Sequence, residues 1–160
     1  MAWATGSCRS SGFGAHSVHE PASGDLPECG IGEEETVLIV DDTHASVLAL
    51  ELACSAIPGI AVCVVPSALE AIKLLERGGP MRAIVTDIRM PGMDGFELIR
   101  FLRDDARHRA TPIIVITADT DPDTPERAAR LGANAFFAKP FSPAAVRQTL
   151  ERLLDAHQDM

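Results

Sequence analysis

From residue 35 onward, short apolar runs alternate with longer stretches that mix apolar and polar residues. The apolar runs lie at 36–40, 60–65, 83–86, 111–116 and 135–138. Runs without polar alternation are typical of strands buried on both faces, which predicts a parallel sheet covered by helices on each side. Helices are expected at 44–56, 68–76, 95–105 and 143–156, with one more ending near 132. The pattern therefore predicts five β–α units in a doubly wound α/β fold.

Polar side chains stand where four of these strands end. Asp41 and Asp42 follow the first strand, Asp87 the third, Thr117 the fourth and Lys139 the fifth. In such sheets a ligand lies in the crevice outside the carboxyl ends of the strands. We therefore expect three carboxylates, one hydroxyl and one ammonium group to share a small crevice at this edge.

This set of side chains predicts a phosphoryl-acceptor site. Three close carboxylates raise one another's pKa unless a cation neutralises them, and Mg²⁺ (or Mn²⁺) suits a site of oxygen ligands. Lys139 supplies a point positive charge that can hold a phosphoryl oxygen. A carboxylate beside both cations can attack a phosphoryl group, because they screen the charge that otherwise repels the donor. Thr117 can then form a hydrogen bond with the transferred group.

In this order, the residues resemble the receiver domain of two-component response regulators. The Asp41-Asp42 pair is similar to that family's acidic metal pair. Asp87, followed by MPGMDG at 90–95, resembles its phosphoacceptor and the loop after it. The dipeptide Lys139-Pro140 resembles its lysine followed by a cis proline. Each motif alone is weak, but the set in this order is specific.

The resemblance implies further roles at the site. Thr117, with Ala118 after it, resembles the family's switch hydroxyl, and Phe136 resembles its switch aromatic. It also implies that Asp42 and Asp87 ligate the metal, with Asp41 acting through water. Arg89 stands where a backbone carbonyl completes the metal site and the side chain overhangs the phosphoryl group. The implied fold is flavodoxin-like, with strand order 2-1-3-4-5.

The function that the resemblance implies is signalling rather than enzymatic turnover. A histidine kinase or phosphotransfer protein supplies the phosphoryl group, and Asp87 accepts it. The chain promotes only its own phosphorylation and dephosphorylation. The changed shape is then read by a protein partner or a second copy, through the fourth helix, fifth strand and fifth helix.

Other interpretations remain open or disfavoured. The chain could be a free-standing receiver, or a receiver module taken from a hybrid histidine kinase or a multidomain regulator. A Mg²⁺-dependent aspartyl phosphatase of the haloacid-dehalogenase type is disfavoured, because Arg89 stands where that class needs its acid. A dinucleotide-binding fold is disfavoured because DDTHAS, not a glycine-rich turn, follows the first strand.

Composition limits the partners and the compartment. Residues 1–34 are rich in Gly, Ser, Pro and Glu and predict a flexible tail, which leaves 35–160 as the receiver domain. The net charge of −9 argues against binding nucleic acid, and no apolar run is long enough to span a membrane. No Cys-x-x-Cys pair occurs, and Cys54 and Cys63 are expected to be buried thiols. These features favour a reducing cytoplasm.

Overall fold

The structure is a computed structural model that describes residues 35–78 and 81–158. Five parallel strands form one sheet in the order β2-β1-β3-β4-β5, as predicted. They are β1 Glu35–Val40, β2 Ile60–Val65, β3 Met81–Thr86, β4 Ile113–Thr117 and β5 Ala135–Ala138. The tail predicted for residues 1–34 lies outside the described residues.

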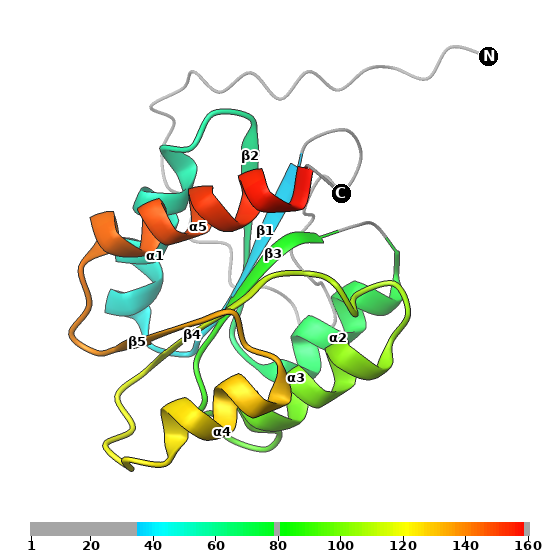
Figure 1. Ribbon diagram of the computed structural model, residues 1–160, viewed down its shortest axis with the longest axis vertical. Coiled ribbons are helices and arrows are strands. Elements are labelled where there is room, and N and C mark those ends of the chain that lie inside the picture. Colours follow the sequence, from blue (N-terminus) through cyan, green and yellow to red (C-terminus); the bar gives the residue numbers. More distant parts are fainter. Residues whose placement is uncertain (1–34, 79–80, 159–160) are drawn as a thin grey trace, which may run out of the picture.

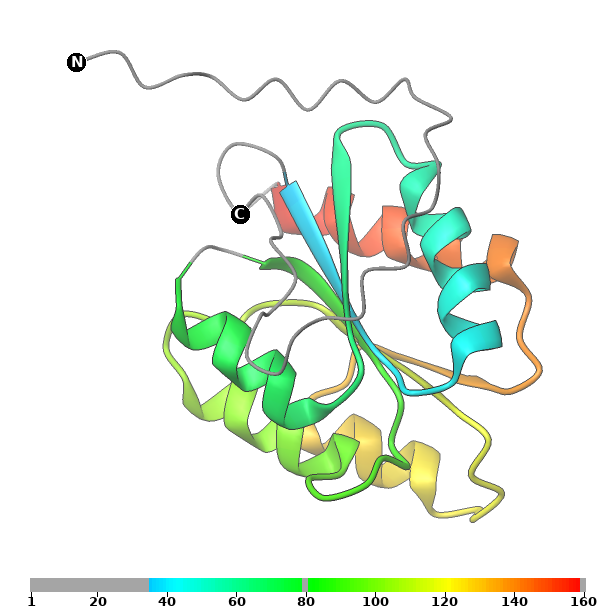
Figure 2. The same ribbon diagram turned by 180° about the vertical axis from the view of Figure 1, so that it is seen from behind.

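Five helices cover the two faces of the sheet. They are α1 His44–Ser55, α2 Ala68–Glu76, α3 Gly95–Asp104, α4 Thr124–Leu131 and α5 Pro143–Gln158. Helices α1 and α5 lie on one face, and α2, α3 and α4 lie on the other (Figures 1 and 2). Because both faces of each inner strand are covered, the strands carry apolar side chains at consecutive positions rather than at alternate ones.

Each face has its own hydrophobic core. On the α1–α5 side, Val37, Ile39 and Ile114 pack with Leu50 and Leu150. The other core holds the opposite side chains of the same strands, together with apolar residues of α2 and α3 and one from α4. Burial of each such Leu or Ile side chain stabilises the fold by roughly 1.5–3 kcal/mol relative to exposure. The consecutive apolar positions of the strands are thus divided between two cores.

The boundaries of β3 and β4 differ from the predicted ones by up to two residues, and β3 begins at Met81 rather than at 83. β4 begins at Ile113 rather than at 111, because Pro112 has no N–H to donate to a neighbouring strand. β4 also includes Thr117, whose register partner is Ala138 on β5. Helix α4 begins only at Thr124, after the polar residues 119–123 that follow β4. The site at the end of β4 is therefore joined to α4 by an extended loop.

The cysteines divide into two cases. Cys54 is a buried free thiol, and burial raises its pKa to about 11, as expected of a cysteine packed like a small apolar side chain. Cys63 is disulfide-bonded, so the expectation of a thiol there is wrong. Within residues 35–78 and 81–158, no helix has the length and apolarity needed to cross a bilayer.

Candidate functional site

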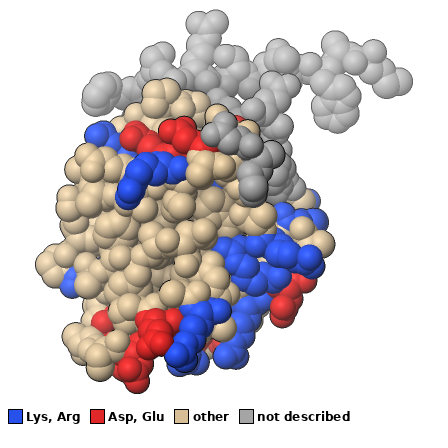
Figure 3. Space-filling model, viewed as in Figure 1, with Lys and Arg blue, Asp and Glu red and all other residues tan. Residues whose placement is uncertain are grey.

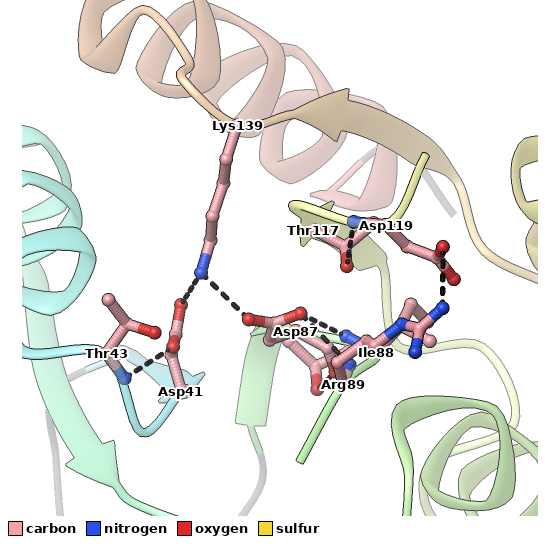
Figure 4. Close-up of polar contacts among 9 residues, drawn as sticks. Asp41, Thr43, Asp87, Ile88, Arg89, Thr117, Asp119 and Lys139 are labelled. Carbon is pink, nitrogen blue, oxygen red and sulfur yellow. Dashed lines mark hydrogen bonds and ion pairs between the residues drawn. The ribbon is translucent and has the colours of Figure 1, made fainter. Parts of the chain in front are cut away.

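The side chains predicted to meet do come together at the carboxyl edge of the sheet. Asp41 follows β1, Asp87 follows β3 and Lys139 follows β5, and their polar ends point toward one another (Figure 4). Asp41 is 3% exposed and Asp87 is 5% exposed. Two carboxylates this deeply buried need compensating positive charge, because desolvation penalises their ionised forms.

Lys139 supplies that charge to both carboxylates. Its Nζ lies 2.9 Å from Asp41 Oδ2 and 2.8 Å from Asp87 Oδ2. Burial by itself lowers the pKa of Lys139, but the hydrogen bonds to Asp87 and Asp41 outweigh it and the pKa is raised. The lysine is thus held as a cation between two strand ends. The Lys139–Pro140 peptide bond that follows is cis, as the family resemblance implied.

The second oxygen of Asp87 is held by the backbone. Asp87 Oδ1 accepts hydrogen bonds from the amides of Ile88, at 2.6 Å, and Arg89, at 3.1 Å. The loop that provides these amides packs against the start of α3, where the Gly95 amide donates to the Ile88 carbonyl at 2.9 Å. A Cβ at Gly95 would overlap the Asp87 carbonyl oxygen and Ile88 Cα. Glycine at 95 therefore allows the loop to lie against the helix, a requirement that the sequence motif did not explain.

Asp41, Asp42 and Asp87 form a group that can hold a hard cation. One carboxylate oxygen from each lies within 4.8 Å of the others. Asp41 Oδ1 accepts from the Thr43 amide at 2.8 Å and its other oxygen binds Lys139, so both oxygens are engaged. Asp42 is exposed, and among the described residues it has no hydrogen-bond partner. Three carboxylates against one ammonium leave a negative excess, and their oxygens are the ligand type that Mg²⁺ prefers.

Thr117 and Phe136 stand on the adjacent strands β4 and β5, two positions apart in the register. Thr117 is fully buried, and its Oγ1 accepts a hydrogen bond from the Asp119 amide at 3.2 Å. Phe136 is opposite Val115 in the register and is partly buried against the core of the α2–α4 side.

The Arg89 side chain turns away from the carboxylates of Asp41, Asp42 and Asp87 and binds Asp119 instead. Its Nη2 lies 3.0 Å from Asp119 Oδ1, so the guanidinium binds the loop after β4 rather than overhanging Asp87 (Figure 4). The sequence did not single out Asp119 as a site residue. Its only sequence signal is its place in a polar segment, two residues after Thr117. The two residues of the Arg89–Asp119 pair are 30 positions apart, so no local sequence pattern links them.

A cleft of about 420 Å³ opens above Asp87 and Lys139. Its other lining residues are Thr43, Arg89, Ala118, Asp119 and Thr120. The cleft gives the Asp87 carboxylate a route to solvent although the residue itself is 5% exposed. An incoming group can therefore reach this carboxylate while Lys139 stays beside it.

A family model matches this arrangement. The model for the response regulator receiver domain covers residues 37–151, from within β1 to within α5. The chain belongs to the response regulator receiver domain family. It is a phosphoacceptor signalling domain of the two-component type.

Individual receivers are similar to this one in sequence, and one is similar in fold as well. Chemotaxis protein CheY1 of Helicobacter pylori is 29% identical over 118 residues, which are 74% of this chain and 95% of that protein. CheY-3 of Vibrio cholerae is 32% identical over 54% of this chain, and the match spans 66% of CheY-3, just under two thirds. The receiver domain of a Pseudomonas aeruginosa sensor histidine kinase, solved with magnesium in its active-site cleft, matches with a TM-score of 0.67. It is 29% identical, over 76% of this receiver and 98% of that one.

Proposed function

We propose that Asp87 is the residue of this receiver that accepts the phosphoryl group, and that a histidine kinase or phosphotransfer protein donates it. The proposal rests on the groups that surround the Asp87 carboxylate. Lys139 binds one carboxylate oxygen at 2.8 Å, two backbone amides bind the other, and a cleft opens above them. No other described carboxylate combines burial, a paired lysine and fixed amides at a strand end next to a cleft.

In the transfer, an Asp87 oxygen attacks the phosphorus atom of phosphohistidine. A P–O bond to the aspartate forms as the P–N bond breaks, and its electron pair stays on the imidazole. The other imidazole nitrogen keeps its proton, so the released ring is a neutral imidazole. Lys139, already held as a cation, balances negative charge on the transferred oxygens. Thr117, at the end of the adjacent strand, supplies a hydroxyl donor to one phosphoryl oxygen.

The metal assignment rests on the acidic group and on the family resemblance. Asp42, which is exposed and has no hydrogen-bond partner among the described residues, would hold Mg²⁺ or Mn²⁺ directly with Asp87 and the Arg89 backbone carbonyl. Asp41, whose two oxygens bind Lys139 and the Thr43 amide, would act through water. The bound cation supplies charge neutralisation for the approach of the phosphoryl donor. The magnesium in the cleft of the related Pseudomonas aeruginosa receiver supports this assignment.

A direct test follows the added mass. The protein is incubated with acetyl phosphate and Mg²⁺, and a phosphoryl group appears as a gain of about 80 Da on one peptide. Asp87→Asn should take up none, whereas the matched variant Asp94→Asn, in the same loop but paired with Glu97 as a helix cap, should be labelled normally. If Asp87→Asn were labelled at the same rate as wild-type protein, the proposal would be wrong.

The surface over α4, β5 and α5 is the proposed output face. Charged side chains gather over α5 and α4, and an uncharged area lies over β5 between them (Figure 3). In β5, Ala135, Phe136 and Phe137 are half-buried. An apolar centre with a charged rim suits a protein partner or a second copy of this receiver better than nucleic acid or a membrane. We place the protein in the cytoplasm from its likeness to the chemotaxis receivers rather than from its cysteines, since Cys63 is disulfide-bonded. We propose no activity beyond its own phosphorylation and dephosphorylation.

A further inference from the structure

Asp119 is the point at which several parts of the site meet. Its Oδ1 binds Arg89 Nη2 at 3.0 Å and the Asp121 amide at 3.1 Å. Its Oδ2 accepts from Thr124 Oγ1 at 3.1 Å, and its own amide donates to Thr117 Oγ1 at 3.2 Å. The side chain is only 8% exposed, so these partners surround it. One carboxylate thus joins the loop after Asp87, the end of β4 and the first residue of α4.

The same ion pair separates two clefts. Arg89 and Asp119 line the cleft above Asp87, and both also line a second cleft with Phe96, Asp121, Thr124 and Arg127. The second cleft lies against the start of α4. The Arg89–Asp119 contact is therefore the wall between the phosphoacceptor side and the α4 side. If the contact opens, both sides change together.

Charge decides which partner Arg89 prefers. Asp119 offers one negative charge, whereas a phosphoryl group on an acyl oxygen brings nearly two at neutral pH. Arg89 is close enough to respond, since its amide lies 3.1 Å from Asp87 Oδ1. Its side chain is 72% exposed, so it can leave Asp119 without displacing packed neighbours. Arginine also forms two parallel hydrogen bonds with phosphoryl oxygens.

We propose that Asp119 is a positioning residue that holds Arg89 and the first turn of α4 in the unphosphorylated state. Phosphorylation of Asp87 moves the Arg89 guanidinium from Asp119 to a phosphoryl oxygen, and Thr117 turns its hydroxyl to the same group. Asp119 then loses its cation, and its hold on Thr124 weakens. The inference rests on the proposed phosphorylation of Asp87, and it specifies how that event reaches α4.

The test is a double-mutant cycle on the affinity for beryllofluoride, a phosphoryl mimic, titrated by calorimetry with Mg²⁺ present. Asp119→Asn keeps the Oδ1 acceptor for the Asp121 amide, places an NH₂ group beside Thr124 Oγ1, and removes the charge that competes for Arg89. It should bind the mimic about two- to five-fold more tightly, the range expected for one exposed ion pair. Arg89→Gln should bind it more weakly by a similar factor, and Arg89→Lys should recover part of the loss.

The double variant distinguishes a transfer of Arg89 from Asp119 to the phosphoryl mimic from two independent effects of the substitutions. If Arg89 mediates the gain, Asp119→Asn has no effect once Arg89 is Gln, whereas additive effects would overturn the proposal. The matched controls are Glu126→Gln and Arg130→Gln, which break an exposed ion pair within α4. They should leave the affinity unchanged. A wild-type protein that fails to bind the mimic, or an Asp87→Asn variant that still binds it, would instead contradict the proposed function.

Amide exchange gives a second readout that needs no phosphoryl chemistry. Asp119→Asn should speed exchange at residues 121–125 without the mimic, and wild-type protein should reach similar rates only when the mimic is bound. Arg89→Gln should exchange like Asp119→Asn in both states. Unchanged exchange at 121–125 on addition of the mimic to wild-type protein would show that α4 is not released.

Discussion

The guanidinium group of Arg103 lies directly against Gly132. Arg103 Nη2 is 2.7 Å from the Gly132 carbonyl oxygen, and a Cβ at position 132 would lie 2.6 Å from Arg103 Nε. Gly132 is the left-handed C-cap of α4, with φ of 113°. Glycine at this position therefore allows both the left-handed backbone conformation and the close approach of Arg103. Arg103 Nη1 also donates to the carbonyls of Thr111, at 2.8 Å, and Arg109, at 3.0 Å. One side chain thus ties the end of α3 to the loop before β4 and to the turn between α4 and β5.

Replacing Arg103 with Ala should lower the free energy of unfolding by roughly 2–4 kcal/mol, because several half-buried carbonyls lose a charged donor. Arg103→Lys should recover little, since one ammonium group cannot reach both loops. Urea unfolding measures the difference. Arg100→Ala, on the exposed side of the same helix, should stay within about 0.5 kcal/mol of wild type. An equal loss for both variants would contradict the role of Arg103.

Lys139→Met should destabilise the metal-free protein by roughly 2–4 kcal/mol, because Asp41 and Asp87 stay buried without their cation. Added Mg²⁺ should raise the melting temperature of this variant more than that of wild type, since the ion replaces the missing charge. Lys73→Met is the control, because Lys73 lies at the surface and its one ion-pair partner within residues 35–78 and 81–158 is Glu70. An equal response to Mg²⁺ in wild type and Lys139→Met would argue against a shared site.

Gly95→Ala should misplace the Asp87 loop, because the added methyl group overlaps the Asp87 carbonyl oxygen and the Ile88 backbone. We expect a loss of roughly 1–3 kcal/mol in stability, together with slower labelling by acetyl phosphate. Asp94→Ala removes the cap of the same helix without a steric clash, at a cost of about 1 kcal/mol. Labelling of Gly95→Ala at the rate of Asp94→Ala would show that the contact does not position Asp87.

His108 should make the fold sensitive to mild acid. The residue is 2% exposed and neither ring nitrogen has a hydrogen-bond partner among the described residues. Burial lowers the pKa of His108, which Asp105 opposes only in part. The folded state therefore favours the neutral ring. Its contribution is fully present above the unfolded pKa of about 6.5 and is lost as pH falls from there toward the lowered folded value.

Urea unfolding between about pH 4.5 and pH 7.5 checks this prediction. His108→Leu removes two unsatisfied buried nitrogens and should gain about 1 kcal/mol at neutral pH. Its stability should also fall less steeply than that of wild type below pH 6.5, since no buried imidazole takes up a proton. Parallel pH profiles for the two proteins would mean that His108 is not the titrating group.

Beryllofluoride should alter amide exchange in a restricted region if Thr117 and Phe136 form the switch. The phosphoryl mimic draws the Thr117 hydroxyl toward itself and opens space beside β5 for Phe136 to move. Exchange should change at residues 117–137 and hardly at all at 68–76 in α2. Thr117→Val, which keeps the shape but lacks the hydroxyl, should abolish the change at 135–137. A uniform response along the chain would contradict a switch built on these two residues.

The sequence by itself determined the fold and the edge of the sheet at which the site lies. Consecutive apolar residues, as at 36–40, can only be buried on both faces, and this requires a parallel sheet between two helical layers. Polar residues directly after strands must then meet at one edge. The positions of Asp87 and Lys139 could therefore be predicted, although 52 residues separate them.

Only the tertiary structure decided how the polar groups are paired. Asp41 and Asp42 are adjacent residues of the same type, and only the structure shows that Asp41 is buried against Lys139 whereas Asp42 faces solvent. The Arg89 side chain was free to reach several carboxylates, and the loop after β4 brings Asp119 to it. The same holds for Arg103, whose acceptors are mostly backbone carbonyls, and a carbonyl has no signature in a sequence. Local pattern sets where the backbone goes, whereas the partner of a long charged side chain depends on distances that exist only after folding.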